Sequence, residues 1–214
     1  MDDCRAEDVA RFFDREACCS SSLYRLVSGR LYAASRILMG MLEDAGVSGR
    51  TVLDAGCGQG ALSVALSRRG MTVTGIDLSP ESVAAAKRAA EQAGVSGRFE
   101  VANAATDSVE PHDVVVLNTV VCCYHDAGAL LGNTLPAARS LVALSRPHSR
   151  GWRGRLARLL LGAENAWRGL RGDPFRAFVH DEAIIMRALD RHGFAVTAQR
   201  NLWSWHIATY ERQP

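Results

Sequence analysis

The sequence predicts an α/β fold built on a mostly parallel sheet. Strand-like and helical runs alternate between residues 51 and 145, and a glycine-rich turn follows the first strand-like run. Two further strand-like runs close the chain. The alternation is typical of parallel strands joined by right-handed crossovers. The two final runs are separated by a short turn and therefore predict an antiparallel hairpin.

The expected elements follow one another without a long linker. Residues 5–46 are predicted to be helical, with a break at Ser20–Ser22. The helix at 80–93 has Ser79 as its N-cap and Pro80 in its first turn, and a shorter helix is expected at 61–69. Strands are expected at 51–54, 71–76, 98–102, 113–117, 141–145, 194–200 and 204–212.

The composition fits one globular domain. Of 214 residues 48% are apolar and 22% charged, enough to build a sizeable core. A net charge of +2 gives no argument for nucleic acid. No apolar run reaches the roughly 20 residues that span a bilayer, and the acidic start Met1–Asp3 lacks the pattern of a signal peptide. We therefore expect a cytoplasmic protein without an integral membrane segment.

The six cysteines are expected to be reduced thiols. Cys18-Cys19 and Cys122-Cys123 are adjacent pairs in a chain without a secretory signal. Adjacent cysteines do not readily chelate one tetrahedral ion, so no metal site is predicted. Cys122 and Cys123 are interpreted as small core residues and not as nucleophiles.

The turn after the first strand carries the clearest functional signal. Residues 52–60 read Val-Leu-Asp-Ala-Gly-Cys-Gly-Gln-Gly. Glycines let the backbone approach a ligand, and the following helix offers free amides. Asp77 ends the second strand, where its carboxylate would accept hydrogen bonds from ribose hydroxyls. A nucleoside ligand is therefore predicted. With Ala61 the pattern also satisfies the dinucleotide fingerprint, and a tight structural turn is the remaining alternative.

These residues resemble the class I S-adenosylmethionine-dependent methyltransferases. The match comprises Val52–Leu62 and Val73–Pro80, continues with Asn103-Ala104 and Asp113–Asn118, and covers residues 48–214. The resemblance implies a Rossmann-like seven-stranded sheet with a C-terminal antiparallel hairpin. It also implies a helical cover at residues 1–47 and S-adenosylmethionine as the cofactor.

The resemblance also implies roles for individual residues. Asp54 and the glycines would hold the methionine moiety, Asp77 the ribose, and Leu78 the adenine. Asn103 stands where the family commonly has aspartate, yet its amide oxygen can still accept a bond from the adenine amino group. The predicted cofactor-binding set is Asp54, Gly56, Cys57, Gly58, Gly60, Asp77, Leu78, Asn103, Ala104 and Asn118.

A dehydrogenase is the competing enzyme class. Short-chain dehydrogenases need a Tyr-x-x-x-Lys pair. Lys87 is the single lysine of the chain, and Val83 stands four residues before it. The sequence therefore argues against an NAD-dependent oxidoreductase.

The end of the fourth strand, residues 118–126, is where the acceptor is expected. Families that methylate planar amino groups have Asn-Pro-Pro-Tyr here, whereas Thr119 and Val120 replace the prolines. This disfavours methylation of DNA bases or amides. Tyr124 and His125 are the candidate catalytic residues, since histidine titrates near neutrality and can take a hydroxyl proton. The alternative is that His125 is a surface residue at a helix start. His112 is expected to face solvent in a polar loop.

The segment at 149–178 is predicted to contain a basic amphipathic helix. Leucines, Ala163 and Trp167 recur at helical spacing among seven arginines. It is interpreted as a surface helix, a membrane-surface helix or a lid over the acceptor. The lid is favoured, because class I enzymes insert substrate-capping elements at this point.

The stretch Phe175–His180 and the Val-Val-Cys-Cys-Tyr motif resemble a group of small bacterial methyltransferases distantly similar to magnesium-protoporphyrin methyltransferases. That similarity is too loose to imply a porphyrin substrate. Arg176 and His180 are expected to contact an acidic or phenolic acceptor, although His180 also suits a cap of the next helix. Phe13 and Tyr24 complete the predicted substrate-binding set.

The predicted reaction is methyl transfer to a small, largely apolar or aromatic metabolite, on oxygen. Aromatic residues are the expected walls of the acceptor site: Phe12, Phe13, Tyr24, Phe175, Phe178 and Trp205. Methylation on carbon or nitrogen, and a non-catalytic cofactor-binding partner protein, remain alternatives. Expected partners are a small molecule, no nucleic acid, and at most a weak membrane-surface contact, with the protein as a monomer or homodimer.

Overall fold

The computed structural model describes residues 5–18 and 22–214, without the side chains of residues 18–32. The helices are α1 (Ala6–Cys18), α2 (Ser22–Asp44), α3 (Ala61–Ser67), α4 (Pro80–Ala93), α5 (Ala127–Thr134), α6 (Gly151–Leu170) and α7 (Glu182–Arg191), with 3-10 turns η1 (Val121–Cys123) and η2 (Leu135–Ala137). The strands are β1 (Thr51–Ala55), β2 (Thr72–Asp77), β3 (Arg98–Val101), β4 (His112–Asn118), β5 (Ala138–Pro147), β6 (Phe194–Asn201) and β7 (Trp205–Arg212).

The seven strands form one sheet in the order β3-β2-β1-β4-β5-β7-β6. The first five strands are parallel, and β7 runs antiparallel to both β5 and β6. The predicted seven-stranded α/β sheet with a C-terminal hairpin is therefore confirmed. Strand β5 is longer than expected, because its pairing with β7 extends to Pro147 opposite Trp205.

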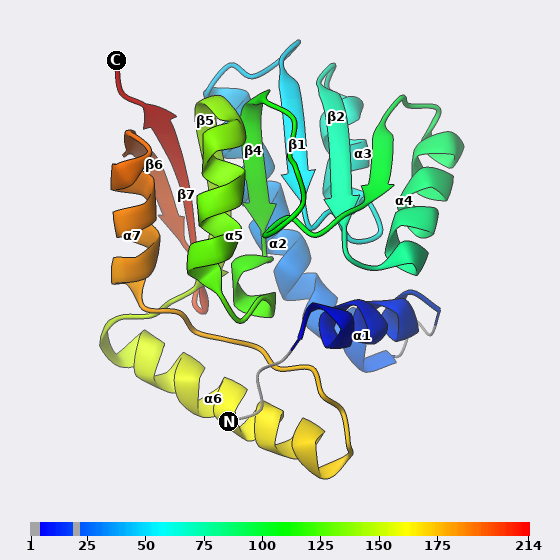
Figure 1. The fold of residues 1–214 in the computed structure, drawn as a ribbon, viewed down its shortest axis with the longest axis vertical. Coiled ribbons are helices and arrows are strands. Elements are labelled where there is room, and N and C mark those ends of the chain that lie inside the picture. Colours follow the sequence, from blue (N-terminus) through cyan, green and yellow to red (C-terminus); the bar gives the residue numbers. More distant parts are fainter. Residues whose placement is uncertain (1–4, 19–21) are drawn as a thin grey trace.

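Helices cover both faces of the sheet (Figure 1). Alternating residues of each strand face opposite sides, so Val52 and Leu53 enter two different cores. One core lies under α5 and α7. The other lies under α2 and α3, where Leu38 and Leu42 of α2 are fully buried. The second half of α2 therefore packs directly on one face of the sheet.

Two local expectations need correction. The sequence predicts a helix start near His125 only as an alternative, because Gly128 and Gly132 weaken the helical pattern. The structure forms α5 there, and Asp126 caps it by accepting from the Ala129 amide at 2.9 Å. His112 does not face solvent. It begins β4, is 6% exposed, and bonds the Thr74 hydroxyl at 3.0 Å across the sheet.

Helices α1 and α6 lie across the end of the sheet where the parallel strands terminate (Figure 1). Ligand sites of doubly wound sheets lie at this end, so both helices stand where a cover is needed. Within the described chain, no helix is long and apolar enough to cross a membrane.

Candidate functional site

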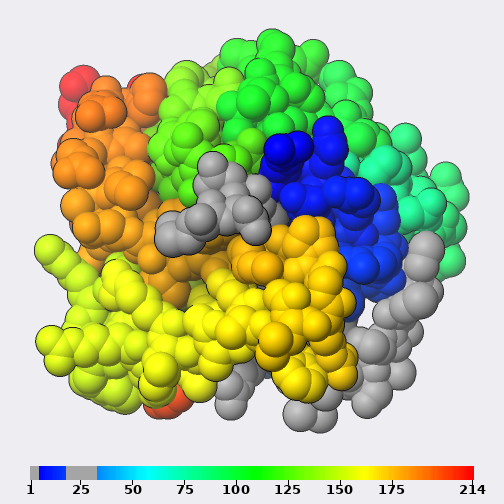
Figure 2. Space-filling view, turned by 60° about the horizontal axis from the view of Figure 1, so that its bottom comes forward, coloured from blue at the N-terminus to red at the C-terminus, as the bar shows by residue number. Residues whose placement is uncertain are grey.

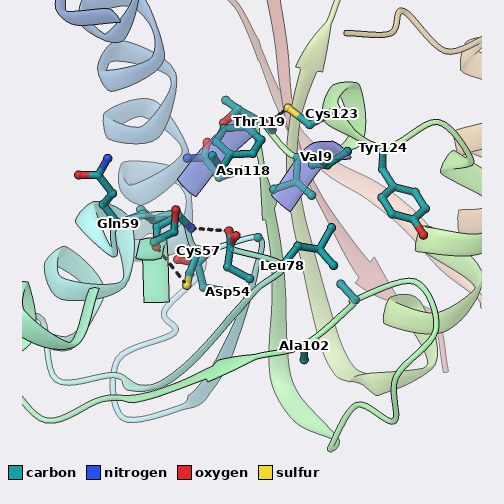
Figure 3. A pocket seen from close by; sticks show the side chains of 18 of the residues that line it. Val9, Asp54, Cys57, Gln59, Leu78, Ala102, Asn118, Thr119, Cys123 and Tyr124 are labelled. Atoms are coloured by element: carbon teal, nitrogen blue, oxygen red, sulfur yellow. Dashed lines mark hydrogen bonds between the residues drawn. The ribbon is translucent and has the colours of Figure 1, made fainter. Parts of the chain in front are cut away.

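A cavity of about 320 Å³ lies at the carboxyl ends of the parallel strands (Figure 3). This volume is at the lower end of the range for small-molecule sites. The strand ends and the loops after them supply Asp54, Gly56, Cys57, Gly58, Gln59, Asp77, Leu78, Ala102, Asn103, Ala104, Asn118, Thr119, Val120, Cys123 and Tyr124. The first turns of α3, α4 and α5 supply Ala61, Leu62, Ser82 and Leu130. Helices α1 and α2 supply Val9, Phe13, Glu16 and Ser35.

The glycine loop is folded tightly against the second strand. The amides of Gly56 and Cys57 donate to the carbonyl of Ile76 at 2.7 and 3.0 Å. Gly56 has a φ of 75°, and a Cβ at this position would lie 2.2 Å from a methyl group of Val120. Only glycine fits there without displacing Val120, a lining residue of the cavity.

Two carboxylates stand at neighbouring strand ends. Asp54 is buried and accepts a bond from the Ser63 hydroxyl at 2.6 Å. Burial raises the pKa of Asp54 to about 6; the bond from Ser63 opposes the shift and the charge of Asp77 adds to it. Asp77 accepts from the amides of Gly58 at 2.8 Å and Ser79 at 2.9 Å. Burial raises the pKa of Asp77 as well, and these amide bonds oppose that rise.

Cys57 lies between these carboxylates in the loop. Burial, together with the charges of Asp54 and Asp77, raises the pKa of its thiol strongly. The thiol therefore stays protonated and is no nucleophile. Cys57 and Cys122 are reduced thiols, as expected for Cys122.

The end of β4 is fixed by side-chain hydrogen bonds. The Asn118 amide donates to the Ser35 hydroxyl at 2.9 Å and accepts from the Ser145 hydroxyl at 2.9 Å. The next residue, Thr119, has a φ of 60°, a left-handed conformation that is unfavourable for a β-branched residue. Its amide donates to the same Ser145 hydroxyl at 2.9 Å. Strain of this kind is typical of functional sites.

Tyr124 and His125 lie in different environments. Tyr124 is 8% exposed and lines the cavity, where its hydroxyl is 3.4 Å from the Asn103 side-chain amide. His125 is exposed and does not line the cavity; its ring stacks on Tyr124 with centroids 5.1 Å apart. The structure brings Tyr124, but not His125, to the predicted site.

Arg176 and His180 contact the backbone of the site region and not the cavity. The Arg176 guanidinium donates to the carbonyls of Asp173 and Phe175. The His180 Nε2 is 2.9 Å from the carbonyl of Tyr124, and burial lowers the pKa of His180. His180 thus holds the chain at Tyr124 in place.

The expected aromatic walls divide between two structures. Phe13 lines the cavity, whereas Phe12 stacks on Phe175 with centroids 4.1 Å apart and planes 10° from parallel. The guanidinium of Arg168 lies over both rings of this stack. Trp205 packs against the core under α2, and Phe178 is not in the lining. Tyr24 lies outside the described side chains.

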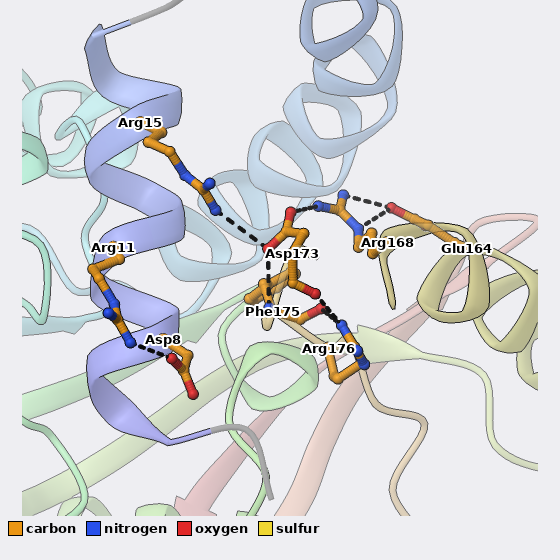
Figure 4. Close-up of polar contacts among 8 residues, drawn as sticks. All are labelled: Asp8, Arg11, Arg15, Glu164, Arg168, Asp173, Phe175 and Arg176. Carbon is orange, nitrogen blue, oxygen red and sulfur yellow. Dashed lines mark hydrogen bonds and ion pairs between the residues drawn. The ribbon is translucent and has the colours of Figure 1, made fainter. Parts of the chain in front are cut away.

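Asp173, in the segment after α6, forms ion pairs with both α1 and α6 (Figure 4). Asp173 accepts from Arg15 of α1 at 3.3 Å and from Arg168 of α6 at 3.2 Å. The stack of Phe12 on Phe175 and these pairs together form what we call the cover cluster. It connects the helix that lines the cavity to the predicted lid.

The predicted cofactor-binding residues converge on the cavity. All ten line it except Gly60, which lies at the start of α3 against Ala86. Lining residues that the sequence pattern did not assign to the site include Glu16 and Ser35, and Thr119 was considered only as a replacement for a proline. The sequence could have indicated Glu16, because it follows Val9 and Phe13 at the spacing that places all three on one face of a helix. Among the described residues, no cluster of three metal-ligating side chains occurs.

Comparison with known proteins points to one family. A family model described as "Methyltransferase domain" matches residues 52–138. A ubiquinone biosynthesis O-methyltransferase of Paramagnetospirillum magneticum is 32% identical over 72% of this chain and 66% of that protein. A ribosomal protein L11 methyltransferase of Edwardsiella ictaluri is 35% identical over 49% of this chain, which spans only 36% of that relative.

Solved structures agree on the fold. The crystal structure of magnesium protoporphyrin IX methyltransferase from Synechocystis with bound SAH has a TM-score of 0.69 and 24% identity. The match covers 87% of this chain and 84% of that one.

Proposed function

We propose, from the premise that the chain belongs to the class I S-adenosylmethionine-dependent methyltransferases, that it methylates a small, largely apolar or aromatic metabolite on oxygen. The observation that carries this proposal is the convergence of the glycine loop, Asp54, Asp77 and Asn103 on one cavity. These residues come from the ends of different strands or from the loops that follow them.

The cavity suits S-adenosylmethionine in charge. Three carboxylates line it, Glu16, Asp54 and Asp77, which is favourable for a ligand with a sulfonium and an ammonium group. In this proposal Asp54 and the loop hold the methionine part, Asp77 holds the ribose, and Leu78 and Asn103 face the adenine. When bound, the cofactor supplies an activated methyl group on its sulfonium.

The remaining work of the chain is to position the acceptor and exclude water. Tyr124 presents a hydroxyl at the cavity wall, and its orientation is supported by Asn103 and, through the backbone, by His180. Glu16 brings a carboxylate from the cover side. We propose that Tyr124 orients the acceptor hydroxyl and that Glu16 receives its proton, with His125 too exposed to act as the base.

Methylation on oxygen is favoured for two reasons. Thr119 and Val120 replace the prolines that serve planar amines, and Thr119 has a φ of 60°, which proline cannot adopt. The relative that is 32% identical over 72% of this chain is a ubiquinone biosynthesis O-methyltransferase. An apolar acceptor is favoured by Val9, Phe13 and Leu78 in the lining.

Calorimetric titration with S-adenosylmethionine, S-adenosylhomocysteine and NAD tests the cofactor. Binding of the two sulfur ligands, and not NAD, is expected. Transfer of a labelled methyl group to matched phenols, anilines and C-acidic enols then tests the acceptor atom. Transfer to phenols alone supports the proposal, and transfer to anilines or carbon alone contradicts it. Binding without transfer to any acceptor would favour a non-catalytic partner protein.

A further inference from the structure

Helix α6 is held to the protein by its small and polar residues. Gly154 is buried, and a Cβ there would lie 2.3 Å from the backbone carbonyl carbon of Ser149. The side chain of Asn165 donates to the carbonyl of Ala177 at 2.8 Å and accepts from its amide at 2.9 Å. A surface helix ordinarily turns its apolar face to the core. In α6 Leu156 and Leu161 are half-buried, whereas most of the large apolar side chains face outward.

The outward face of α6 carries large apolar side chains that stay exposed. Their exposed fraction runs from 53% at Leu160 to 83% at Leu170. Trp203, in the turn between β6 and β7, continues this surface, with its ring centroid 6.5 Å from that of Trp152. In Figure 2, α6 lies at the molecular surface along its length. The apolar stripe comprises Trp152, Leu159, Leu160, Trp167, Leu170 and Trp203.

Arginines border the apolar stripe. The guanidinium of Arg153 lies 5.5 Å from the ring centroid of Trp152, and that of Arg171 lies 4.5 Å from that of Trp167. Glu164 is the single acid in the sequence of α6, and it is paired with an arginine of the next turn. The border of the stripe is therefore positively charged.

Charge decides between the occupants of this surface. A second copy of the chain would bring arginines against arginines, which repel. Anionic headgroups complement them, and tryptophan and leucine are the residues that enter the boundary between headgroups and acyl chains. A helix of 20 residues offers about 30 Å of such contact.

We propose that α6 lies flat on an anionic lipid bilayer. The apolar stripe enters the boundary of the acyl chains, and the bordering arginines contact the headgroup phosphates. The proposal concerns only this surface and holds whether or not the protein transfers methyl groups.

Flotation with vesicles tests the docking. Wild-type protein is expected to float with vesicles of phosphatidylglycerol and phosphatidylcholine, and weakly with phosphatidylcholine alone. The double variant Leu159→Ser, Trp167→Ser should partition at least roughly tenfold less. The control is Val101→Ser, Val196→Ser, which removes apolar side chains that are 55% and 51% exposed elsewhere. Its partition should equal that of the wild type.

Two further readouts separate lipid from other occupants. Three of the four tryptophans lie in the apolar stripe, so anionic vesicles should shift the fluorescence of the protein to the blue. Arg153→Gln with Arg171→Gln should lower partition severalfold, and added salt should do the same. The proposal is overturned if the Leu159→Ser, Trp167→Ser variant partitions onto anionic vesicles as strongly as the wild type. The proposal is also overturned if the wild type binds no vesicles but forms a dimer, and the Leu159→Ser, Trp167→Ser variant is a monomer. Circular dichroism checks that each variant is folded.

Discussion

The two sides of the cavity are held together by different interactions. On the strand side, formed by the strand ends and the glycine loop, the hydrogen bonds come from backbone amides. Those of Gly56 and Cys57 donate to the carbonyl of Ile76, and those of Gly58 and Ser79 donate to the carboxylate of Asp77. On the cover side, formed by α1, α6 and the segment after α6, the contacts are between side chains, namely the stack of Phe12 on Phe175 and the ion pairs of Asp173. The strand side is restricted by its glycines, since a Cβ at Gly56 would lie 2.2 Å from a methyl group of Val120, whereas side-chain contacts between distant segments are readily changed by substitution. We therefore expect the strand side to fix the cofactor and the cover side to vary with the acceptor.

Asp77 and Asp14 provide the sharpest test, because both accept hydrogen bonds from Ser79, one from its amide and the other from its hydroxyl. Asp14 of α1 accepts from the Ser79 hydroxyl at 2.6 Å and from the Glu81 amide at 3.2 Å. Asp77→Ala leaves two loop amides without their carboxylate, and we expect cofactor affinity to fall by roughly 100-fold or more. Asp14→Ala should lower it by about tenfold or less, because Asp14 does not line the cavity. Equal losses in calorimetric titration would contradict the comparison.

Two glycines of α6 test how the cover is anchored. Gly154→Ala places a methyl group against the backbone of Ser149 and should lower the free energy of unfolding by about 1–3 kcal/mol. Gly162→Ala is the matched control, since its Cβ would meet nothing within 4 Å. The control should stabilise the protein by up to about 1 kcal/mol through helix propensity. Denaturant unfolding measures both, and a stabilising Gly154→Ala would mean that α6 is not seated as described.

The same contrast explains what the sequence could predict. Residues 52–60 form one continuous motif, and Asp77 follows at the end of the next strand. Local sequence patterns therefore predict the strand side, and nine of the predicted cofactor-binding residues line the cavity. Arg15 and Asp173 are 158 positions apart, and nothing local indicates that they pair. For this reason the sequence predicts Phe12 and Phe175 as cavity walls, whereas in the structure they pack on each other outside the lining. Likewise, no local pattern shows that His112 bonds Thr74 inside the sheet.

Asp54 makes the strand side sensitive to pH. Its folded-state pKa of about 6 is above the unfolded value, so its contribution to stability is complete below about pH 4 and is lost as pH rises through 6. A cationic cofactor prefers the ionised carboxylate, and its affinity should therefore rise about tenfold between pH 5 and pH 7.

Two variants check this assignment by calorimetric titration across that range. Asp54→Asn should remove the pH dependence. Ser63→Ala should move its midpoint upward, because the Ser63 hydroxyl stabilises the charged carboxylate. A midpoint that stays in place in Ser63→Ala would assign the titration to another group, such as Asp77.

The smallest effects are expected where the two sides meet, at Tyr124 and His125. Tyr124→Phe removes a hydroxyl from the cavity wall and should lower kcat by up to about tenfold, leaving cofactor affinity unchanged. His125→Ala removes an exposed ring that contacts the cavity only through its stack on Tyr124, so we expect a loss of less than about threefold. A loss of two orders of magnitude or more in His125→Ala, with affinity intact, is the signature of a general base. That result would mean that the segment after β4 closes on the acceptor and carries His125 inward. The chemistry would then depend on a movement of the strand side, and the cover side would no longer be the adjustable half.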